Sequence, residues 1–294
     1  MPGPRPSAAA AATALSSSGS PAEAGLKIRT LLVAGLGNAS HPLTRHSVGQ
    51  LLAQNLLRRA CADPACLART SPALLPARFG PGGKHKALCS ARVSIRGPAR
   101  GGGAQRLDLW FVIPKAAMNI CGPTIAAAYA QHVPPARIPE PKAPASLDTS
   151  PDLEADSAAT PAPTSDGRRA PSKRHTPPRP PPPSDPLLRL VTLQDDLDLS
   201  PSVLKYQRAG GPRGHNGVRS VSSPGALGTN RFHRLWVGIG RPEERSEVAR
   251  WVLSPLSREE VRRCEFEEEA GRGGEVLERA WNEVLRIGFE EEEP

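Results

Sequence analysis

The spacing of apolar and polar residues predicts strands that alternate with helices in two separate stretches of the chain. Short apolar runs bounded by turn residues predict strands over residues 28–34, 86–95, 107–113, 187–193, 203–206 and 232–239. A period near 3.6 predicts helices over residues 48–60, 120–132 and 215–221, and a last helix with apolar positions Leu277, Trp281, Val284, Leu285 and Gly288. Alternation of this kind indicates an α/β fold.

Two regions lack any such pattern. Residues 134–186 contain 16 of the 34 prolines and no aromatic residue. A segment of this composition cannot bury enough apolar surface to offset its ordering entropy, so we expect a disordered insertion. Residues 1–27 are rich in Ala, Ser and Pro and are also expected to be disordered. The predicted organisation is one domain over residues 28–133 and 187–289, followed by an acidic tail over 290–294.

The composition narrows the class of protein. No run approaches 18 apolar residues, so no membrane-spanning helix is expected. The five cysteines lack C-x-x-C or zinc-ligand spacing, which argues against a disulfide framework and fits a reducing compartment. Residues 1–27 share the low acidity of transit peptides but hold a single arginine, so mitochondrial and cytosolic locations both stay open, and secretion is not expected.

Positive charge is concentrated in the predicted domain. Residues 28–133 and 187–258 together carry 24 basic and 8 acidic residues, a net charge of +16, whereas residues 259–294 carry thirteen Glu against five Arg. This distribution favours a polyanionic partner such as nucleic acid. A biased composition in which arginine is simply common would give the same charge, so charge alone does not decide.

Polar residues gather where predicted strands end, which is where open α/β sheets bind ligands. Asn38 and Asn119 each offer a hydrogen-bond donor and an acceptor, and Met118 suits an apolar wall. His46 stands just before a helix, whose dipole favours the neutral imidazole that can act as a general base. Taken singly, each of these segments is also compatible with an ordinary turn, a surface histidine or a capped helix start.

Two other ligand sites are less favoured. A dinucleotide site needs a third glycine, but Ser40 stands at that position. Asp195 and Asp196 could contribute to a metal site, but strand alternation sends them to opposite faces and the charges nearby are positive. The Gly-rich loop of residues 210–217 instead suits a sugar-phosphate backbone, because its glycines expose N–H groups and Arg213 can fork onto phosphate.

Taken together and in order, these segments resemble the bacterial-type peptidyl-tRNA hydrolase family. Short matches of this kind are spread over more than 200 residues. They are residues 32–38 (LVAGLGN), 44–46 (TRH) with Val48 and Gly49, 114–119 (PKAAMN) with Gly122, 195–199 (DDLDL), 210–211 (GG) with 214–217 (GHNG), and 232–235 (FHRL) with 238–242 (GIGRP). Residues 248–253 (VARWVL) also resemble the region before the family's C-terminal helices.

The resemblance implies a carboxylic ester hydrolase that cleaves the bond between peptide and tRNA and returns free tRNA to translation. It implies a single domain with a twisted mixed sheet flanked by helices, a C-terminal helical portion, no metal or organic cofactor, and peptidyl-tRNA as partner. Independently of the resemblance, we expect no membrane partner and a monomer. His46 corresponds to the catalytic histidine and Asp195 to its carboxylate. The implied substrate-binding residues are Asn38, Met118, Asn119, Asn216 and His215. We expect the basic residues nearby to contact the tRNA backbone, and these are Lys205, Arg208, Arg213 and Arg234.

The chain departs from the family at several positions. Ser47 replaces an asparagine, and the loop between Asn38 and His46 is shorter and lacks its aromatic residue. Gln207 and Trp236 occupy two positions that are basic in bacterial members, where they clamp the tRNA 5′ phosphate. These departures bear on tRNA affinity more than on catalysis.

Two alternatives belong to other functional classes. A non-catalytic RNA-binding relative, of the kind that serves as a splicing cofactor, would have no need of His46 and Asp195, so their presence favours the enzyme. The run of prolines over residues 177–183 could instead dock SH3- or WW-type domains, although such runs are also common as spacers.

Overall fold

The structure, a computed structural model, describes residues 26–70, 87–98, 104–134 and 187–290. The predicted disorder of residues 134–186 and 1–27 therefore falls almost wholly outside the described residues, as does the acidic tail after residue 290. No helix of the described residues is long and apolar enough to cross a membrane. Within the same residues, four cysteines are free: Cys61, Cys66, Cys121 and Cys264.

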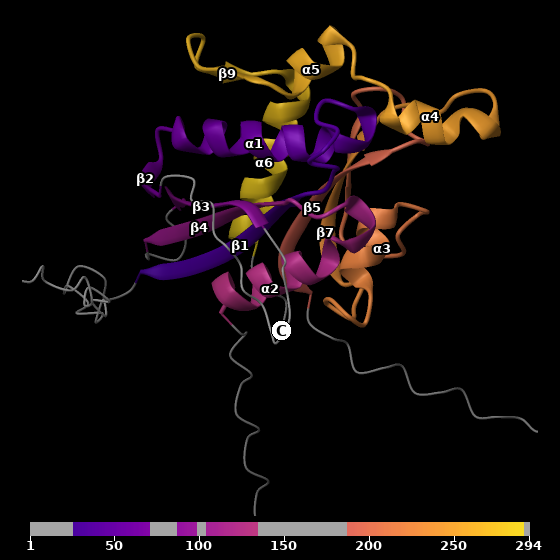
Figure 1. The fold of residues 1–294 in the computed structure, drawn as a ribbon. Helices are drawn as coiled ribbons and strands as arrows, with labels where there is room; N and C mark the ends of the chain where they lie inside the picture. The colour runs from indigo at the N-terminus through magenta and orange to yellow at the C-terminus, as the bar shows by residue number, and fades with distance from the viewer. Residues whose placement is uncertain (1–25, 71–86, 99–103, 135–186, 291–294) are drawn as a thin grey trace, which may run out of the picture. The chain divides into compact units, whose positions relative to one another are not determined.

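A seven-stranded mixed sheet forms the centre of the domain, in the order β2-β3-β4-β1-β5-β7-β6 (Figure 1). Its strands are β1 Lys27–Gly35, β2 Cys66–Arg69, β3 Ala87–Arg96, β4 Gln105–Pro114, β5 Leu188–Asp196, β6 Leu204–Gln207 and β7 Phe232–Gly238. Strands β4, β1, β5 and β7 run parallel, while β2, β3 and β6 pair in antiparallel fashion. The predicted α/β fold with a mixed sheet is confirmed.

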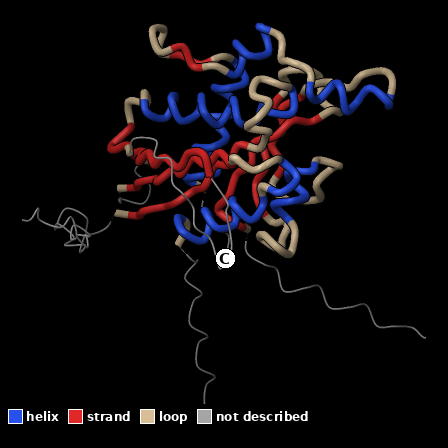
Figure 2. The backbone as a smooth tube through the Cα atoms, in the orientation of Figure 1, coloured by secondary structure: helices blue, strands red, loops and turns tan. Residues whose placement is uncertain are grey.

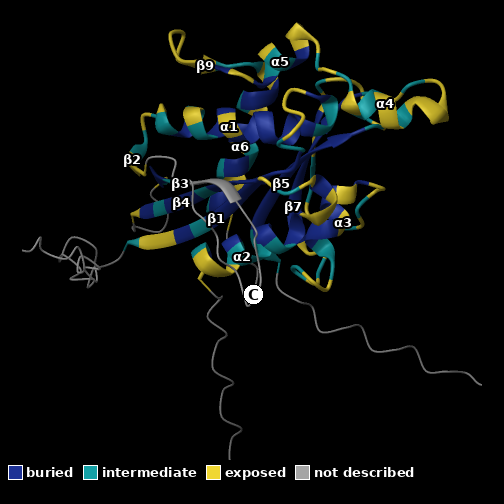
Figure 3. Cartoon of the chain, viewed as in Figure 1, coloured by how far each residue is buried: buried dark blue, intermediate teal, exposed yellow. Residues whose placement is uncertain are grey.

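Helices cover both faces of the sheet (Figures 1 and 2). One hydrophobic cluster joins the sheet to α1 (Val48–Cys61) and α6 (Glu275–Phe289). A second cluster joins the opposite face to α2 (Gly122–His132) and α3 (Asn216–Ser222). Most of each central strand is buried and the outer helix faces are exposed, as Figure 3 shows. The remaining elements are short: η2 Arg45–Ser47, η3 Met118–Ile120, η4 Arg245–Glu247, α4 Val248–Leu253, α5 Arg258–Cys264, β8 Phe266–Glu267 and β9 Arg272–Gly273.

The sequence pattern misses the short elements and one strand end. Strand β5 continues past residue 193 through Asp196, because its ladder with β7 extends to the pair Asp196 and Gly238. Strand β2 exposes most of its residues, and helices α4 and α5 are only six and seven residues long, so all three carry little apolar periodicity. The extension of β5 matters for the site, because it holds two aspartates on a rigid strand.

Gly49 lets the start of α1 approach the end of β5 closely. A Cβ atom at this position would lie 2.1 Å from the carbonyl oxygen of Leu193, a separation that real Cβ atoms do not show. Only glycine therefore permits this approach without a shift of the backbone. The consequence is that η2, which immediately precedes α1, lies beside the carboxyl end of β5.

Strand β7 contains a buried histidine that has to stay neutral. His233 is 4% exposed, and its Nδ1 lies 2.9 Å from the hydroxyl of Tyr206. Burial, together with the charges of Arg189, Arg208 and Arg286, lowers the pKa of His233 to about 3. An unfolded histidine titrates near 6.5.

We predict that His233 makes the fold sensitive to acid. Between pH 6.5 and about 3 the unfolded chain binds a proton at this position and the folded protein does not, so stability falls as the pH falls, by up to about 1.4 kcal/mol per pH unit. His233→Gln removes this titration and should flatten the decline, measured by urea unfolding between pH 7 and pH 4. The same change at the exposed His41 is the control, and an unchanged slope in His233→Gln would contradict the prediction.

Candidate active site

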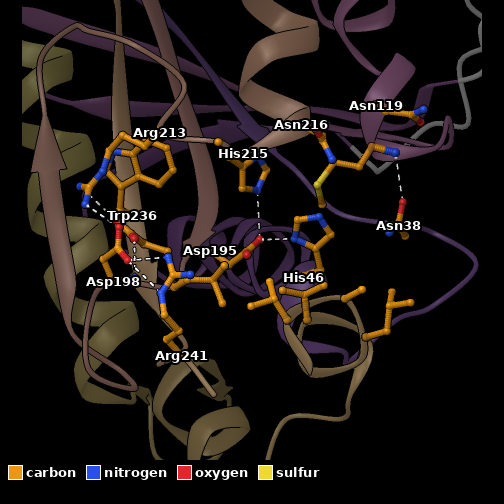
Figure 4. Close-up of a pocket in the computed structure, with 18 of the residues that line it drawn as sticks. Asn38, His46, Asn119, Asp195, Asp198, Arg213, His215, Asn216, Trp236 and Arg241 are labelled. Carbon is orange, nitrogen blue, oxygen red and sulfur yellow. Dashed lines mark hydrogen bonds and ion pairs between the residues drawn. The ribbon is translucent and has the colours of Figure 1, made fainter. Parts of the chain in front are cut away.

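Three titratable side chains meet at the carboxyl end of β5 (Figure 4). Nδ1 of His46 lies 2.8 Å from Oδ1 of Asp195, and Nε2 of His215 lies 3.0 Å from the same oxygen. His46 comes from η2 and His215 is the N-cap residue of α3. The Asp195 side chain is 4% exposed, whereas that of His46 is 16% exposed and lines a cavity of about 760 Å³.

The hydrogen-bond partners assign a different role to each histidine. The backbone N–H of Val218 donates to Nδ1 of His215 at 3.2 Å, so the neutral ring carries its proton on Nε2 and donates it to Asp195. His46 faces the same carboxylate with Nδ1, which leaves its Nε2 available to accept a proton. The arrangement therefore contains one histidine that only orients the carboxylate and one that can act as a base.

Asp195 is held in its ionised form. Burial acts to raise its pKa, but its interactions with His215 and then with His46 outweigh burial and hold the pKa well below its ordinary value. The carboxylate is thus charged across the physiological range. It can stabilise a positive charge on His46 whenever that ring takes up a proton.

The same three residues also carry atoms that could bind a metal ion. Each offers one ligand atom, and these atoms lie within 4.8 Å of one another. A metal bound at Nε2 of His215 would require the ring proton to move to Nδ1, which already accepts the N–H of Val218. The donor set therefore fits a hydrogen-bonded relay better than a metal centre.

The predicted substrate-binding residues surround the same cavity. Those that line it are Asn38, Met118, Asn119, His215 and Asn216. Oδ1 of Asn38 accepts the backbone N–H of Met118 at 3.0 Å, which ties the loop after β1 to η3. Asn119 and Asn216 are exposed at the cavity, where their amides can reach a bound molecule. The structure thus brings together side chains that the sequence places up to 178 positions apart.

Ser47 closes the short loop between Asn38 and His46. Its Oγ accepts the backbone N–H of Asn38 at 3.1 Å and lies 2.8 Å from the carbonyl oxygen of His41, to which it donates. A hydroxyl is short enough to make both contacts from the end of η2. The departure at position 47 therefore accompanies a compact loop that holds Asn38 in place.

The two other departures are partners of each other. The indole Nε1 of Trp236 donates to Oε1 of Gln207 at 2.8 Å, and Nε2 of Gln207 donates to the carbonyl oxygen of Ala209 at 2.7 Å. Trp236 is 1% exposed, so its N–H needs a partner within the protein. Gln207 provides the acceptor that the buried indole N–H needs, and the pair carries no charge.

The basic residues expected to contact tRNA differ in their exposure. Lys205 and Arg208 are exposed, on β6 and directly after it. Arg213 is held by Asp196, with its NH1 atom 3.0 Å from the carboxylate, and its guanidinium lies 5.6 Å from the ring centre of Trp236. These three remain compatible with a role in RNA contact.

Arg234 does not fit its predicted role. It is 0% exposed, lies 4.2 Å above the ring of Phe232 and donates to the carbonyl oxygen of Asn230 at 3.1 Å. Burial lowers its pKa to about 10. Residue 234 points to the same face of β7 as Phe232 and Trp236, which belong to a buried hydrophobic cluster, so its guanidinium is buried and does not make the surface contact expected from the sequence.

Sequence reasoning missed one wall of the cavity. It is formed by Val248, Ala249, Val252 and Leu253 of α4, together with Arg241, Arg245 and Ser246 before it. Arg241 pairs with Asp198 at 2.7 Å and lowers the pKa of that carboxyl. The separation of Val248 and Val252 by four residues was the available signal, but a six-residue helix is too short for it to stand out.

Part of this chain is similar in sequence to one family of known proteins. Residues 185–283 match the family model described as peptidyl-tRNA hydrolase. The peptidyl-tRNA hydrolases of Rhodococcus jostii and Azoarcus sp. are 41% identical over 101 residues and 45% identical over 71 residues. These alignments cover 34% and 24% of this chain, and the chain spans 49% and 32% of the length of the two relatives. A crystal structure of peptidyl-tRNA hydrolase from Acinetobacter baumannii aligns with 88% of this chain and 86% of that one, at 19% identity and a TM-score of 0.43.

We predict that His215 stabilises the fold through two separable contacts. His215→Ala removes a helix cap worth about 1 kcal/mol and a donor to a buried carboxylate worth roughly 1–3 kcal/mol. His215→Asn keeps an oxygen that can cap α3, so it should recover the capping part of the loss. Urea unfolding measures both variants, with the exposed Asn216→Ala as the control. Equal stability of His215→Ala and the unaltered protein would show that these contacts contribute nothing.

Proposed function

Because this chain belongs to the peptidyl-tRNA hydrolase family, we propose that it hydrolyses the ester bond between peptide and tRNA in peptidyl-tRNA and releases free tRNA. The observation that carries the proposal is the contact of His46 with Asp195 beside a cavity lined by three asparagines. The matched residues 185–283 include Asp195, whereas His46 lies outside them. The contact between the two is therefore independent of that match.

In the proposed reaction His46 acts as the general base. Its Nε2 takes a proton from a water molecule while the water oxygen attacks the ester carbonyl. Asp195 stabilises the imidazolium that forms, and His215 keeps the carboxylate in place. The proton then passes from His46 to the departing 3′ oxygen of the ribose, so the products are the free peptide acid and tRNA.

The asparagine amides around the cavity would stabilise the negative charge that develops on the ester oxygen. Asn119 and Asn216 are exposed at the cavity and can donate to the oxyanion or to the peptide backbone. The Asn38 amide has its oxygen engaged by Met118, so its NH₂ group is the part left to face a substrate. The apolar wall of α4 would face the peptide side chains.

A non-catalytic RNA-binding relative is the second candidate. It is supported by the exposed cations Lys205 and Arg208 and by the net charge of +16 over residues 28–133 and 187–258. Such a protein would bind tRNA without cleaving it. Incubating the purified protein with N-acetyl-aminoacyl-tRNA and following release of free tRNA separates the two functions.

We predict that His46→Ala abolishes hydrolysis while tRNA affinity stays near that of the unaltered protein. Asp195→Asn should lower kcat by roughly 10²–10⁴-fold, because the charge that stabilises the imidazolium is lost. The double variant should be little worse than the poorer single variant, since the two residues act as one unit.

The control for these variants is His41→Ala, which removes an exposed histidine of the same loop. Hydrolysis by His46→Ala at the unaltered rate would remove His46 from the mechanism. Binding of tRNA without cleavage by the unaltered protein would instead support the RNA-binding candidate.

We predict that Lys205→Ala and Arg208→Ala raise KM more than they lower kcat, because these exposed cations would contact the tRNA backbone and not the ester. Binding should also weaken steeply with salt as counterions are released. Arg69→Ala is the matched control, because β2 lies at the opposite edge of the sheet from β6. Equal effects at both edges would mean that the charge acts only through the overall field.

A further inference from the structure

The C-terminal arm, defined here as residues 248–260, is joined to the loop that carries His46. The backbone N–H of Arg45 donates to the carbonyl oxygen of Ser254 at 3.0 Å. The N–H of Leu256 donates to the carbonyl oxygen of Leu43 at 2.9 Å, and Thr44 forms an isolated β-bridge with Pro255. The arm and this loop are thus paired along their backbones immediately before His46.

The Arg45 side chain extends this junction. Its guanidinium carbon lies 4.3 Å from the ring centre of Trp251, and NH1 donates to the carbonyl oxygen of Pro255 at 3.2 Å and to Oε2 of Glu260 at 3.1 Å. The Arg45 and Glu260 side chains are only 12% and 11% exposed. A cation so covered and so partnered is part of the protein interior and is not a surface contact for RNA.

Trp251 carries the connection to the cavity. Its Nε1 donates to the carbonyl oxygen of Gly240 at 2.9 Å, which fastens α4 just beyond the end of β7. No residue of α4 is fully buried, and the helix packs against the main hydrophobic cluster only through the partly buried Trp251 and Val252. The same helix supplies the apolar wall of the cavity through Val248 and Val252.

We infer that Arg45 is a positioning residue, which holds the α4 wall of the cavity and the neighbouring His46 in one fixed arrangement. The inference rests on the proposed hydrolysis, in which His46 is the base. Arg45 does not line the cavity and has no hydrogen bond to the Asp195 carboxylate. It acts through η2 on one side and through Trp251 on the other, so the peptide-facing wall and the base move together.

Arginine is required at this position for its shape as well as its charge. A planar guanidinium can stack on an indole and donate to two acceptors at once, whereas an ammonium group satisfies one carboxylate and cannot stack in this way. Arg45→Lys should therefore keep the contact with Glu260 and lose the contact with Trp251. Arg45→Met should lose both.

The effect should fall on the chemical step. A misplacement of about 1 Å at a catalytic group can cost roughly 10²-fold in rate. We expect Arg45→Met to lower kcat by about 10–10²-fold with KM and tRNA affinity unchanged, and Arg45→Lys to lie between it and the unaltered protein. Trp251→Leu should show the same division between kcat and KM, and the double variant Arg45→Met with Trp251→Leu should be no worse than the poorer single variant.

The experiment compares these variants with Arg250→Met, which removes an arginine of α4 that is 86% exposed and pairs only with Glu247 among the described residues. Single-turnover hydrolysis of N-acetyl-aminoacyl-tRNA gives the rate, and filter binding gives the tRNA affinity. NMR of the ring proton on Nδ1 of His46, which Asp195 holds, reports the position of the base without any turnover. This signal should persist in Arg250→Met and shift or broaden in Arg45→Met and Trp251→Leu.

Three outcomes would overturn the inference. One is a rate for Arg45→Met equal to that of Arg250→Met. Another is a rise in KM with kcat unchanged, which would make Arg45 an RNA contact. The third is an unaltered His46 ring signal in both Arg45→Met and Trp251→Leu. Absence of hydrolysis by the unaltered protein is a different result, because it removes the proposed function while the ring signal still reports whether Arg45 positions His46.

Discussion

The site depends on one carboxylate oxygen that two imidazoles share. Oδ1 of Asp195 is contacted by His46 and by His215, and the second histidine is itself fixed by the first turn of α3. Asp195 lies near the end of the β5 ladder, where it pairs with Val237 of β7, so its position is set by the central sheet. A buried charge of this kind is tolerated only when it is fully hydrogen-bonded, so the elements that supply the histidines are constrained together.

This constraint explains the close contacts elsewhere in the fold. Gly49 brings α1 against the end of β5, and Gly122 brings α2 against α3, where a Cβ atom would lie 2.1 Å from the carbonyl oxygen of Ser220. The first contact places η2 beside Asp195, and the second fixes the helix whose cap is His215. Helix packing on both faces of the sheet therefore converges on a single side chain.

The regular elements and most of the site could be predicted from the sequence, because they rest on local pattern. Asn38, Asn119 and Asp195 could be recognised as polar residues that follow apolar runs, and the resemblance to a family related them to one another. The features that the sequence did not predict are those that depend on tertiary contacts. Nothing local distinguishes Arg234 from an exposed arginine except strand alternation, and the pairing of Gln207 with Trp236 joins positions 29 residues apart. The wall formed by α4 is made of a helix too short to produce a periodic signal.

Electrostatics near the cavity differ from those of the domain as a whole. The large positive charge suggests that tRNA would meet cations everywhere, yet Arg213 and Arg241 are both paired with carboxylates of the β5 end, Asp196 and Asp198. The cavity lining holds three carboxylates and three guanidinium groups, so their charges balance: Asp195, Asp196 and Asp198 with Arg213, Arg241 and Arg245. In the proposed reaction, long-range attraction by the domain would raise the rate of encounter with tRNA, and the Asp195 carboxylate would stabilise the imidazolium that forms on His46. Under the proposed function, exposed cations would bind tRNA and the buried carboxylate with its histidines would carry the chemistry. Arg213, which the sequence suggested as an RNA contact, is itself paired with Asp196.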